Sequence, residues 1–278
     1  MISAAKKLLF GTAGIPHSAA KDTTLSGIEC ISKLKLDCLE IEFVKGIKIG
    51  IDTALKIKNA ALARQVSLSA HAPYYINLNA EEEGKRLVSQ ERILATARIA
   101  ELCGARSVVF HCGYYGKSTP EQAYETILKG IKEVSSILRS ERNEVVLRPE
   151  TMGRHSQFGT LEEILQLCRE VEGILPCLDF SHIYTRNGKA NSYSEFHRIL
   201  RKVEKKLGKK ALKKAHLHIS GAEFTAKGER KHVDLKECDF HYDDWIQVLK
   251  DFEVEGMVIC ESPNLEQDAL MLKKLFTI

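Results

Sequence analysis

The sequence predicts an α/β fold, a single (β/α)8 TIM barrel over residues 1–278, and three observations support this. Eight short apolar, β-branched runs alternate with longer segments of helical period. Successive runs are separated by about one strand and one helix throughout, which indicates βα repeats and a parallel sheet. No Pro- or Ser-rich linker divides the 278 residues, a length that suits one large barrel of about 250 residues.

The eight candidate strands are short and close to evenly spaced. Each is rich in apolar and β-branched residues, as expected of a strand buried on both faces. They are Lys7–Gly11, Cys38–Phe43, Val66–His71, Ser107–His111, Glu144–Glu150, Ile174–Asp179, Lys214–Ile219 and Gly256–Glu261.

The intervening segments carry signals for where helices begin and end. Gly104 is expected to end a long helix whose apolar face includes Ile93 and Ala97. The last two helices are expected at Tyr242–Phe252 and Leu265–Phe276. Capping boxes are predicted at three helix starts, namely Thr119 to Gln122, Thr160 to Glu163 and Ser192 to Glu195.

Three long stretches without a helical pattern follow the third, sixth and seventh strands. They are Ala72–Glu82, Ile183–Tyr193 and Ser220–Phe240. Connections of this length are usually functional or disordered. In a barrel, the loops after strands form the face where active sites lie, so we expect the functional residues there.

Composition limits the class of protein. With 44% hydrophobic and 28% charged residues, the chain is globular rather than disordered. No apolar stretch approaches the ~20 residues of a membrane span, and we expect a cytoplasmic protein without membrane partners. The eight cysteines include no Cys-x-x-Cys pair, which argues against a zinc ribbon and favours reduced core thiols. We interpret the basic run 201–214 as a solvated helix face opposite the strand C-termini.

Residues of the kinds that bind metal ions close six consecutive strands. The ends of barrel strands form a ring, so these side chains are expected to converge. A buried network of charges without ions would cost several kcal/mol per charge, because neutral imidazoles cannot balance three carboxylates. The residues are His71, His111, Glu150, Asp179 with His182 just beyond it, His216 and Glu261, and His232 lies in the loop after the seventh strand.

The mixture of ligand types indicates which metals fit. Imidazoles and carboxylates without a thiolate suit Zn²⁺, Mn²⁺ or Fe²⁺. Eight candidate ligands exceed the needs of one ion, so two or three ions are predicted, with Glu150 as a bridging carboxylate. Clustered divalent ions are typical of phosphodiester hydrolysis, so hydrolytic phosphoryl chemistry is the class indicated.

Six strand-end segments form a set with a specific order and spacing. They are S-A-H-A-P-Y-Y-I-N-L (69–78), V-V-F-H-C-G (108–113), L-R-P-E-T-M-G (147–153), C-L-D-F-S-H (177–182), A-H-L-H (215–218) and I-C-E-S-P (259–263). This set covers nearly the whole chain and resembles the endonuclease IV family of apurinic/apyrimidinic endonucleases, which adopt the xylose-isomerase-like TIM barrel. The resemblance implies three zinc ions and cleavage of duplex DNA 5′ to an abasic site in base excision repair.

The resemblance also implies a role for each ligand-type residue. Glu150 and Glu261 are the catalytic carboxylates expected from it, zinc is the expected metal with manganese as an alternative, and a monomer is the expected state. One ion is expected at His71, His111 and Glu150, a second at Glu150, Asp179, His216 and Glu261, and a third at His182 and His232.

The chain departs from the family at the third ion. The family has an Asp-x-His pair in the loop after the seventh strand, whereas this chain has Arg230-Lys231-His232, with Glu229 one residue out of register. Either Glu229 reaches in through an adjustment of the loop, or the third site is weak.

Three residues are expected to contact DNA by the same resemblance. Tyr74 matches a tyrosine that enters the minor groove beside a flipped nucleotide, although a tyrosine there could equally cover the barrel mouth. Lys45 and Lys48 follow the second strand, where the family has basic phosphate contacts. Double-stranded DNA with abasic sites is the expected partner.

Two other functions remain open. A one-metal sugar isomerase or epimerase on the same barrel would use only Glu150, Asp179, His216 and Glu261. The additional histidines at 71, 111 and 232 favour the nuclease, and the altered third site favours the isomerase. A non-catalytic DNA- or sugar-phosphate-binding barrel ranks last, because it needs no complete ligand set.

Two inward-facing residues have no assigned role. Arg148 shares the parity of Glu150, so it is expected inside the barrel, paired with Glu40 or Glu42. His218 shares the parity of His216, and it could replace a missing ligand or support one from behind.

Overall fold

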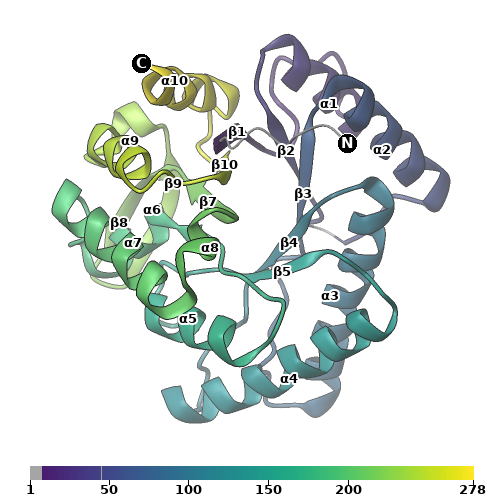
Figure 1. Ribbon diagram of the computed structural model, residues 1–278. Helices are drawn as coiled ribbons and strands as arrows, with labels where there is room; N and C mark the ends of the chain where they lie inside the picture. Colours follow the sequence, from purple (N-terminus) through teal and green to yellow (C-terminus); the bar gives the residue numbers. More distant parts are fainter. Residues whose placement is uncertain (1–7, 45) are drawn as a thin grey trace.

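The computed structural model describes residues 8–44 and 46–278. Its main sheet has eight parallel strands in the order β5-β4-β3-β2-β1-β10-β7-β6. A parallel bridge between Glu150 and Cys177 joins the β5 and β6 edges, so the sheet closes on itself. This confirms the predicted α/β barrel, and the helices form a ring outside it (Figure 1).

All eight predicted strands are present, and seven of them agree with the predicted bounds within two residues at each end. The predicted first residue, Lys7, lies outside the described residues. The barrel strands are β1 (Leu8–Ala13), β2 (Cys38–Glu42), β3 (Ser67–His71), β4 (Ser107–Phe110), β5 (Val146–Pro149), β6 (Leu178–Asp179), β7 (Ala215–Ile219) and β10 (Gly256–Cys260).

Strand β6 is much shorter than the range 174–179 predicted for it. Pro176 lies in that range, and proline has no N–H to donate to a neighbouring strand. Its carbonyl oxygen instead accepts a hydrogen bond at 3.0 Å from Arg148 Nη1 inside the barrel. Only Leu178 and Asp179 therefore pair regularly with β7.

The helices begin and end largely where their capping signals predict. Capping boxes are present at Thr119 and Thr160, and Gly104 ends α3 with a φ of 77°. The capping box predicted at Ser192 is wrong, because its hydroxyl donates to Glu195 instead of accepting from the helix. The helices are α1 (Thr24–Lys33), α2 (Ile51–Arg64), α3 (Glu83–Cys103), α4 (Pro120–Ser140), α5 (Leu161–Glu170), α6 (Phe180–Asn187), α7 (Tyr193–Leu207), α8 (Lys209–Leu212), α9 (Tyr242–Asp251) and α10 (Glu266–Thr277), with a 3₁₀ turn η1 at Leu235–Glu237.

Two of the stretches predicted to lack a helical pattern contain regular structure. The sixth-strand stretch is half helical, since α6 continues to Asn187 from an N-cap at Asp179. The seventh-strand stretch contains an antiparallel hairpin, β8 (Gly221–Thr225) with β9 (Gly228–Val233). Helix α6 lies against β6 and β7, and the hairpin packs on α6, so both elements lie at the face where the candidate ligands converge.

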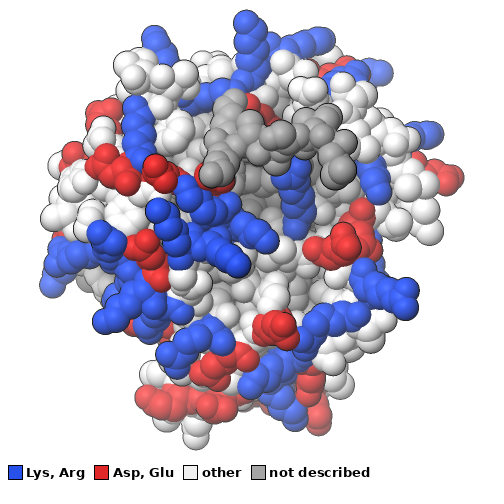
Figure 2. Space-filling view, viewed as in Figure 1, with Lys and Arg blue, Asp and Glu red and all other residues white. Residues whose placement is uncertain are grey.

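The basic run 201–214 lies at the opposite end of the barrel. Helices α7 and α8 lead into β7, so they reach the end where the strands begin, and Figure 1 is viewed from that end. Lys and Arg side chains gather around α8 in Figure 2. Lys202 and Lys206 pair with Glu162, and Lys213 pairs with Glu255, which agrees with a solvated helix face. Among the described residues, no helix has the length and apolar character needed to cross a bilayer.

Candidate metal centre

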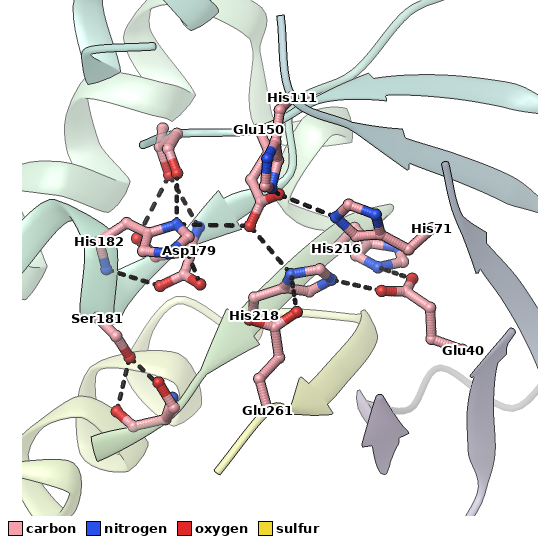
Figure 3. Close-up of polar contacts among 12 residues, drawn as sticks. Glu40, His71, His111, Glu150, Asp179, Ser181, His182, His216, His218 and Glu261 are labelled. Carbon is pink, nitrogen blue, oxygen red and sulfur yellow. Dashed lines mark hydrogen bonds and ion pairs between the residues drawn. The ribbon is translucent and has the colours of Figure 1, made fainter. Parts of the chain in front are cut away.

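The interior of the barrel is polar toward the ends of the strands. Side chains of a strand alternate in direction, so every second residue points inward. Glu40, Ser69 and His216 form a deeper layer, completely or almost completely buried. The layer above it, nearer the mouth, supplies the members of two ligand groups shown in Figure 3, and His182 with two residues of the loop after β7 forms a third.

The first group consists of His71, His111 and Glu150. Glu150 Oε2 lies 3.3 Å from His71 Nε2 and 3.0 Å from His111 Nε2. On its other side, the His71 ring places Nδ1 2.7 Å from the carbonyl oxygen of Ala72. That contact places the ring proton on Nδ1 and leaves the Nε2 lone pair directed at Glu150.

The second group consists of Glu150, Asp179, His218 and Glu261. His218 Nδ1 lies 3.1 Å from Glu150 Oε1 and 3.1 Å from Glu261 Oε1 (Figure 3). Asp179 accepts the His182 backbone N–H through Oδ1, while its buried Oδ2 has no hydrogen-bond partner among the described residues. Glu150 belongs to both groups, so they share one carboxylate.

The third group consists of His182, Glu229 and His232. Glu229 Oε2 lies 3.0 Å from His182 Nε2, and Oε1 lies 3.3 Å from His232 Nε2. Both rings are held from behind by carbonyl oxygens, His182 Nδ1 by Thr151 at 2.9 Å and His232 Nδ1 by Glu261 at 3.2 Å. Glu229 thus reaches both histidines of the third group, which is one of the two outcomes expected for the altered loop.

A β-bulge brings Glu229 into this group. On the hairpin, Glu223 pairs with Lys231 and Phe224 pairs with Glu229, so the backbone of Arg230 is left out of the strand pairing. Side chains three residues apart in a regular strand point to opposite faces, but one extra residue returns them to the same face. Glu229 and His232 therefore face His182 together, while Arg230 is exposed.

The structure places His218, and not His216, beside the carboxylates of the second group. His216 lies one layer deeper, with Nε2 3.0 Å from Glu40 Oε2 and Nδ1 3.2 Å from Ser107 Oγ. Both of its ring nitrogens are occupied, and within residues 8–44 and 46–278 the one candidate ligand group that includes His216 is with Cys177 and His218. The strand end itself carried the signal, because β7 ends at Ile219, directly after His218.

The deeper layer contains a carboxylate that the sequence argument did not place in the site. Arg148 is inside the barrel as expected, but it donates to the carbonyl oxygens of Pro176 at 3.0 Å and Lys214 at 2.8 Å, so the predicted pairing with Glu40 or Glu42 is wrong. Glu40 instead contacts His216, His218 and Ser69. The sequence signal that could have placed Glu40 in the site is its inward-facing position on a buried strand.

The buried carboxylates of these groups favour positive charge nearby, as the pKa values of two of the histidines show. Burial alone would lower the pKa of His71, but its hydrogen bond to Glu150 and nearby carboxylates raise it to about 9. Burial likewise opposes the charge of His232, yet its contact with Glu229 raises its pKa to about 9. Burial raises the pKa of Asp179 to about 6 and lowers that of His216 to about 4, so His216 is neutral.

The donor sets fit divalent cations. An unprotonated imidazole nitrogen facing a carboxylate oxygen at about 3 Å sets two acceptors against each other. A proton or a cation resolves this conflict, and Asp179 Oδ2, which accepts no hydrogen bond from any described residue, adds a further acceptor. In each group the ligand atoms lie within 4.8 Å of one another. Nitrogen and oxygen donors in this arrangement suit Zn²⁺ or Mn²⁺, so the three groups are candidate sites for divalent metal ions.

The residues expected to contact DNA lie around the mouth. The Tyr74 ring stacks on His111 with centroids 5.3 Å apart, and 42% of the residue is exposed. Its hydroxyl lies 3.4 Å from Glu42 Oε2. The Tyr74 ring therefore covers the first group while part of the side chain stays exposed to solvent. Lys48 is exposed on the loop before α2, and Lys45 lies outside the described residues.

Comparisons with known sequences agree with this architecture. A family model described as xylose isomerase-like TIM barrel matches residues 28–275. The chain is 47% identical over 270 residues to an uncharacterized protein of Methanocaldococcus jannaschii, with 97% of each chain covered. It is 26% identical over 216 residues to a probable endonuclease 4 of Shouchella clausii, covering 73% of this chain and 69% of that one.

Solved structures of two kinds of enzyme share the fold. A D-tagatose 3-epimerase-like protein superposes with a TM-score of 0.74 at 17% identity and covers 96% of both chains. Endonuclease IV from Thermus thermophilus superposes with a TM-score of 0.71 at 20% identity, covering 96% of this chain and 97% of that chain. At such identities the likeness establishes the barrel and does not choose between hydrolase and epimerase.

Proposed function

The chain belongs to the xylose isomerase-like TIM barrel family, and from that premise we propose that it is a divalent-metal phosphodiester hydrolase that cuts duplex DNA 5′ to abasic sites. The observation that carries the proposal is the presence of three groups of histidines and carboxylates at the mouth, two of which share Glu150. A one-metal isomerase needs only the second group. The first and third groups would then be buried histidine and carboxylate clusters without a use.

The ligand groups define the chemistry available at the mouth. Divalent ions bound by these groups would supply Lewis acidity there, lowering the pKa of water and neutralising charge on phosphate oxygens. Glu150 holds the first two groups together through its two oxygens. Glu261 is the carboxylate of the second group nearest to solvent, with 10% of its side chain exposed. It is therefore placed to receive the proton of an attacking water on its carboxylate.

Recognition of the lesion would come from the exposed residues of the mouth. A nucleotide without a base costs little to unstack, so a flipped abasic site enters a narrow mouth more readily than an intact nucleotide. Tyr74, half-exposed beside the first group, is placed to fill the gap in the stack. Lys48 would contribute a sequence-independent phosphate contact, which makes binding sensitive to salt.

The second group alone supports one other function. Glu150, Asp179, His218 and Glu261 could hold a single ion that polarises a ketose, while two carboxylates move protons between its carbons. This sugar isomerase or epimerase would leave the third group dispensable.

Metal content and incision of an abasic duplex together test the proposal. We expect two or three zinc or manganese ions per chain and chelator-sensitive nicking 5′ to the lesion. Glu261→Gln should reduce nicking by at least about 100-fold, because it removes an ionised ligand at the site of reaction. Glu223→Gln, a change on the exposed face of the hairpin, is the matched control and should nick normally. One ion per chain, no nicking and turnover of a ketose would instead establish the isomerase.

A further inference from the structure

We propose that Glu40 is a positioning residue that fixes the tautomer of His218, so that Nδ1 of this ring is the atom presented to the second group. The inference rests on the proposed metal centre and extends it to a residue outside the three ligand groups. Glu40 lies on β2, one layer deeper than His71, and is completely buried.

The His218 ring lies between two sets of carboxylates (Figure 3). Its Nε2 atom is 2.9 Å from Glu40 Oε1, and its Nδ1 atom is 3.1 Å from both Glu150 and Glu261. Both atoms of the Glu40 contact are buried, and neither Glu40 Oε1 nor His218 Nε2 forms an aligned hydrogen bond with any described residue, so the two atoms meet as a close ion-pair contact. Glu40 supplies the carboxylate on the deep side of the ring, where Cys177 Sγ also lies within 4.8 Å of a His218 ring nitrogen.

The chemistry of imidazole turns this contact into a choice of ligand atom. A neutral ring has one N–H and one lone pair, and a carboxylate can only accept. Carboxylates face both ring nitrogens, so a cation held among Glu150, Glu261 and Nδ1 would take the lone pair of Nδ1, and Glu40 would then accept the N–H on Nε2. A carboxylate behind a ligating histidine also raises the basicity of the ligand.

His218 is unusual among the candidate ligands in this respect. His71, His182 and His232 are held at Nδ1 by main-chain carbonyl oxygens and present Nε2. His218 is turned the other way and is held by a side chain. A point substitution can therefore remove the support of this one ring and leave the other supports in place.

Glu40 is itself held by neutral donors. Its Oε2 atom accepts from the Ser69 hydroxyl at 2.7 Å and lies 3.0 Å from His216 Nε2. No lysine or arginine forms an ion pair with it among the described residues, so its charge is directed at the histidines. His216 therefore orients the carboxylate, and the carboxylate orients His218.

Zinc binding by Glu40→Gln tests the assignment. We expect one of the bound ions to dissociate about 10- to 100-fold more readily in chelator competition, with the others unchanged. Glu42→Gln is the matched control, because it alters a carboxyl two residues along the same strand that contacts Tyr74 and no histidine by a hydrogen bond. Unchanged zinc affinity in Glu40→Gln, or an equal loss from every site, would overturn the assignment.

A second measurement uses the unaltered protein, so it does not depend on whether Glu40→Gln folds. In ¹⁵N spectra of the zinc-loaded protein, the His218 ring, identified by its absence in His218→Asn, should carry a proton on Nε2 and bind zinc through Nδ1. Zinc on Nε2 would contradict the role of Glu40. If the protein binds zinc in this way but does not nick abasic DNA, the proposed function fails and the role of Glu40 stands. Absence of zinc binding by the unaltered protein overturns both.

Discussion

His216 and His218 lie two residues apart on one strand and face the same way, yet they play different parts. His218 reaches the carboxylates at the mouth, whereas both nitrogens of His216 are engaged below it by Glu40 and Ser107. An A-H-L-H segment gives both rings the same parity, so alternation alone cannot separate them. The end of the strand separates them, because only its last inward residue reaches the mouth.

Substitution of the two histidines should separate metal binding from stability. His218→Asn should lose the ion of the second group, because it removes the one nitrogen ligand there. His216→Asn should keep the full metal content, because Ser69 still holds Glu40, and should lose about 1–3 kcal/mol of unfolding free energy, because buried Glu40 Oε2 loses one of its two hydrogen-bond donors. Elemental analysis and chemical denaturation of both variants measure the two effects. A loss of metal in His216→Asn would show that this ring is a ligand.

At the scale of elements, the hairpin β8–β9 is the part that sequence patterns did not predict. Its turn, Thr225-Ala226-Lys227-Gly228, lacks the Asn-Gly or Asp-Gly pair that marks a tight hairpin. The eight barrel strands were predictable because each is buried on both faces and reads as an apolar run. Gly153 and Gly228 let the hairpin approach the loop after β5, since a Cβ at Gly228 would lie 2.2 Å from the Gly153 carbonyl oxygen.

The bulge at Arg230 makes a prediction about register. Glu229→Gln should lose the third ion alone, because it weakens the carboxylate between His182 and His232. Adding Arg230→Asp, which restores the Asp-x-His spacing of the endonuclease IV family, should not recover that ion, because position 230 faces solvent. Zinc content of the single and double variants measures both. Recovery of the ion in the double variant would show that β9 can pair without the bulge.

Across the whole molecule, the candidate site could be predicted as a ring of strand ends but not as a layered network. The convergence of the strand ends follows from the closure of any eight-stranded barrel. The second layer depends on how far each side chain lies from the mouth, which is a property of the closed barrel. Glu40 and the carbonyl contacts of Arg148 could therefore not be assigned from the sequence.

The same network predicts that the thermal stability of metal-free protein and of zinc-loaded protein depends differently on alkaline pH. The pKa of His71 and His232 is raised to about 9 in the folded chain, above the ~6.5 of an unfolded histidine. The stabilisation of the folded state by these two protonated histidines is therefore complete below pH 6.5 and is lost as pH rises through 9. Metal-free protein should lose thermal stability over that pH range. Zinc-loaded protein should not, because its imidazoles are already unprotonated. Thermal denaturation with chelator and with zinc tests this, and parallel curves for the two forms would contradict it.

The closure of the barrel at Glu150 and Cys177 has a consequence for how the molecule is held together. Seven of the eight strand neighbours share at least one run of paired residues, whereas β5 and β6 meet through a single bridge next to the two-residue strand β6. Glu150 is also the carboxylate common to the first two ligand groups. Ions bound there would tie β3, β4, β5, β6, β7 and the end of β10 across this seam. The bound ions would then stabilise the closure of the barrel between β5 and β6, in addition to their part in the reaction.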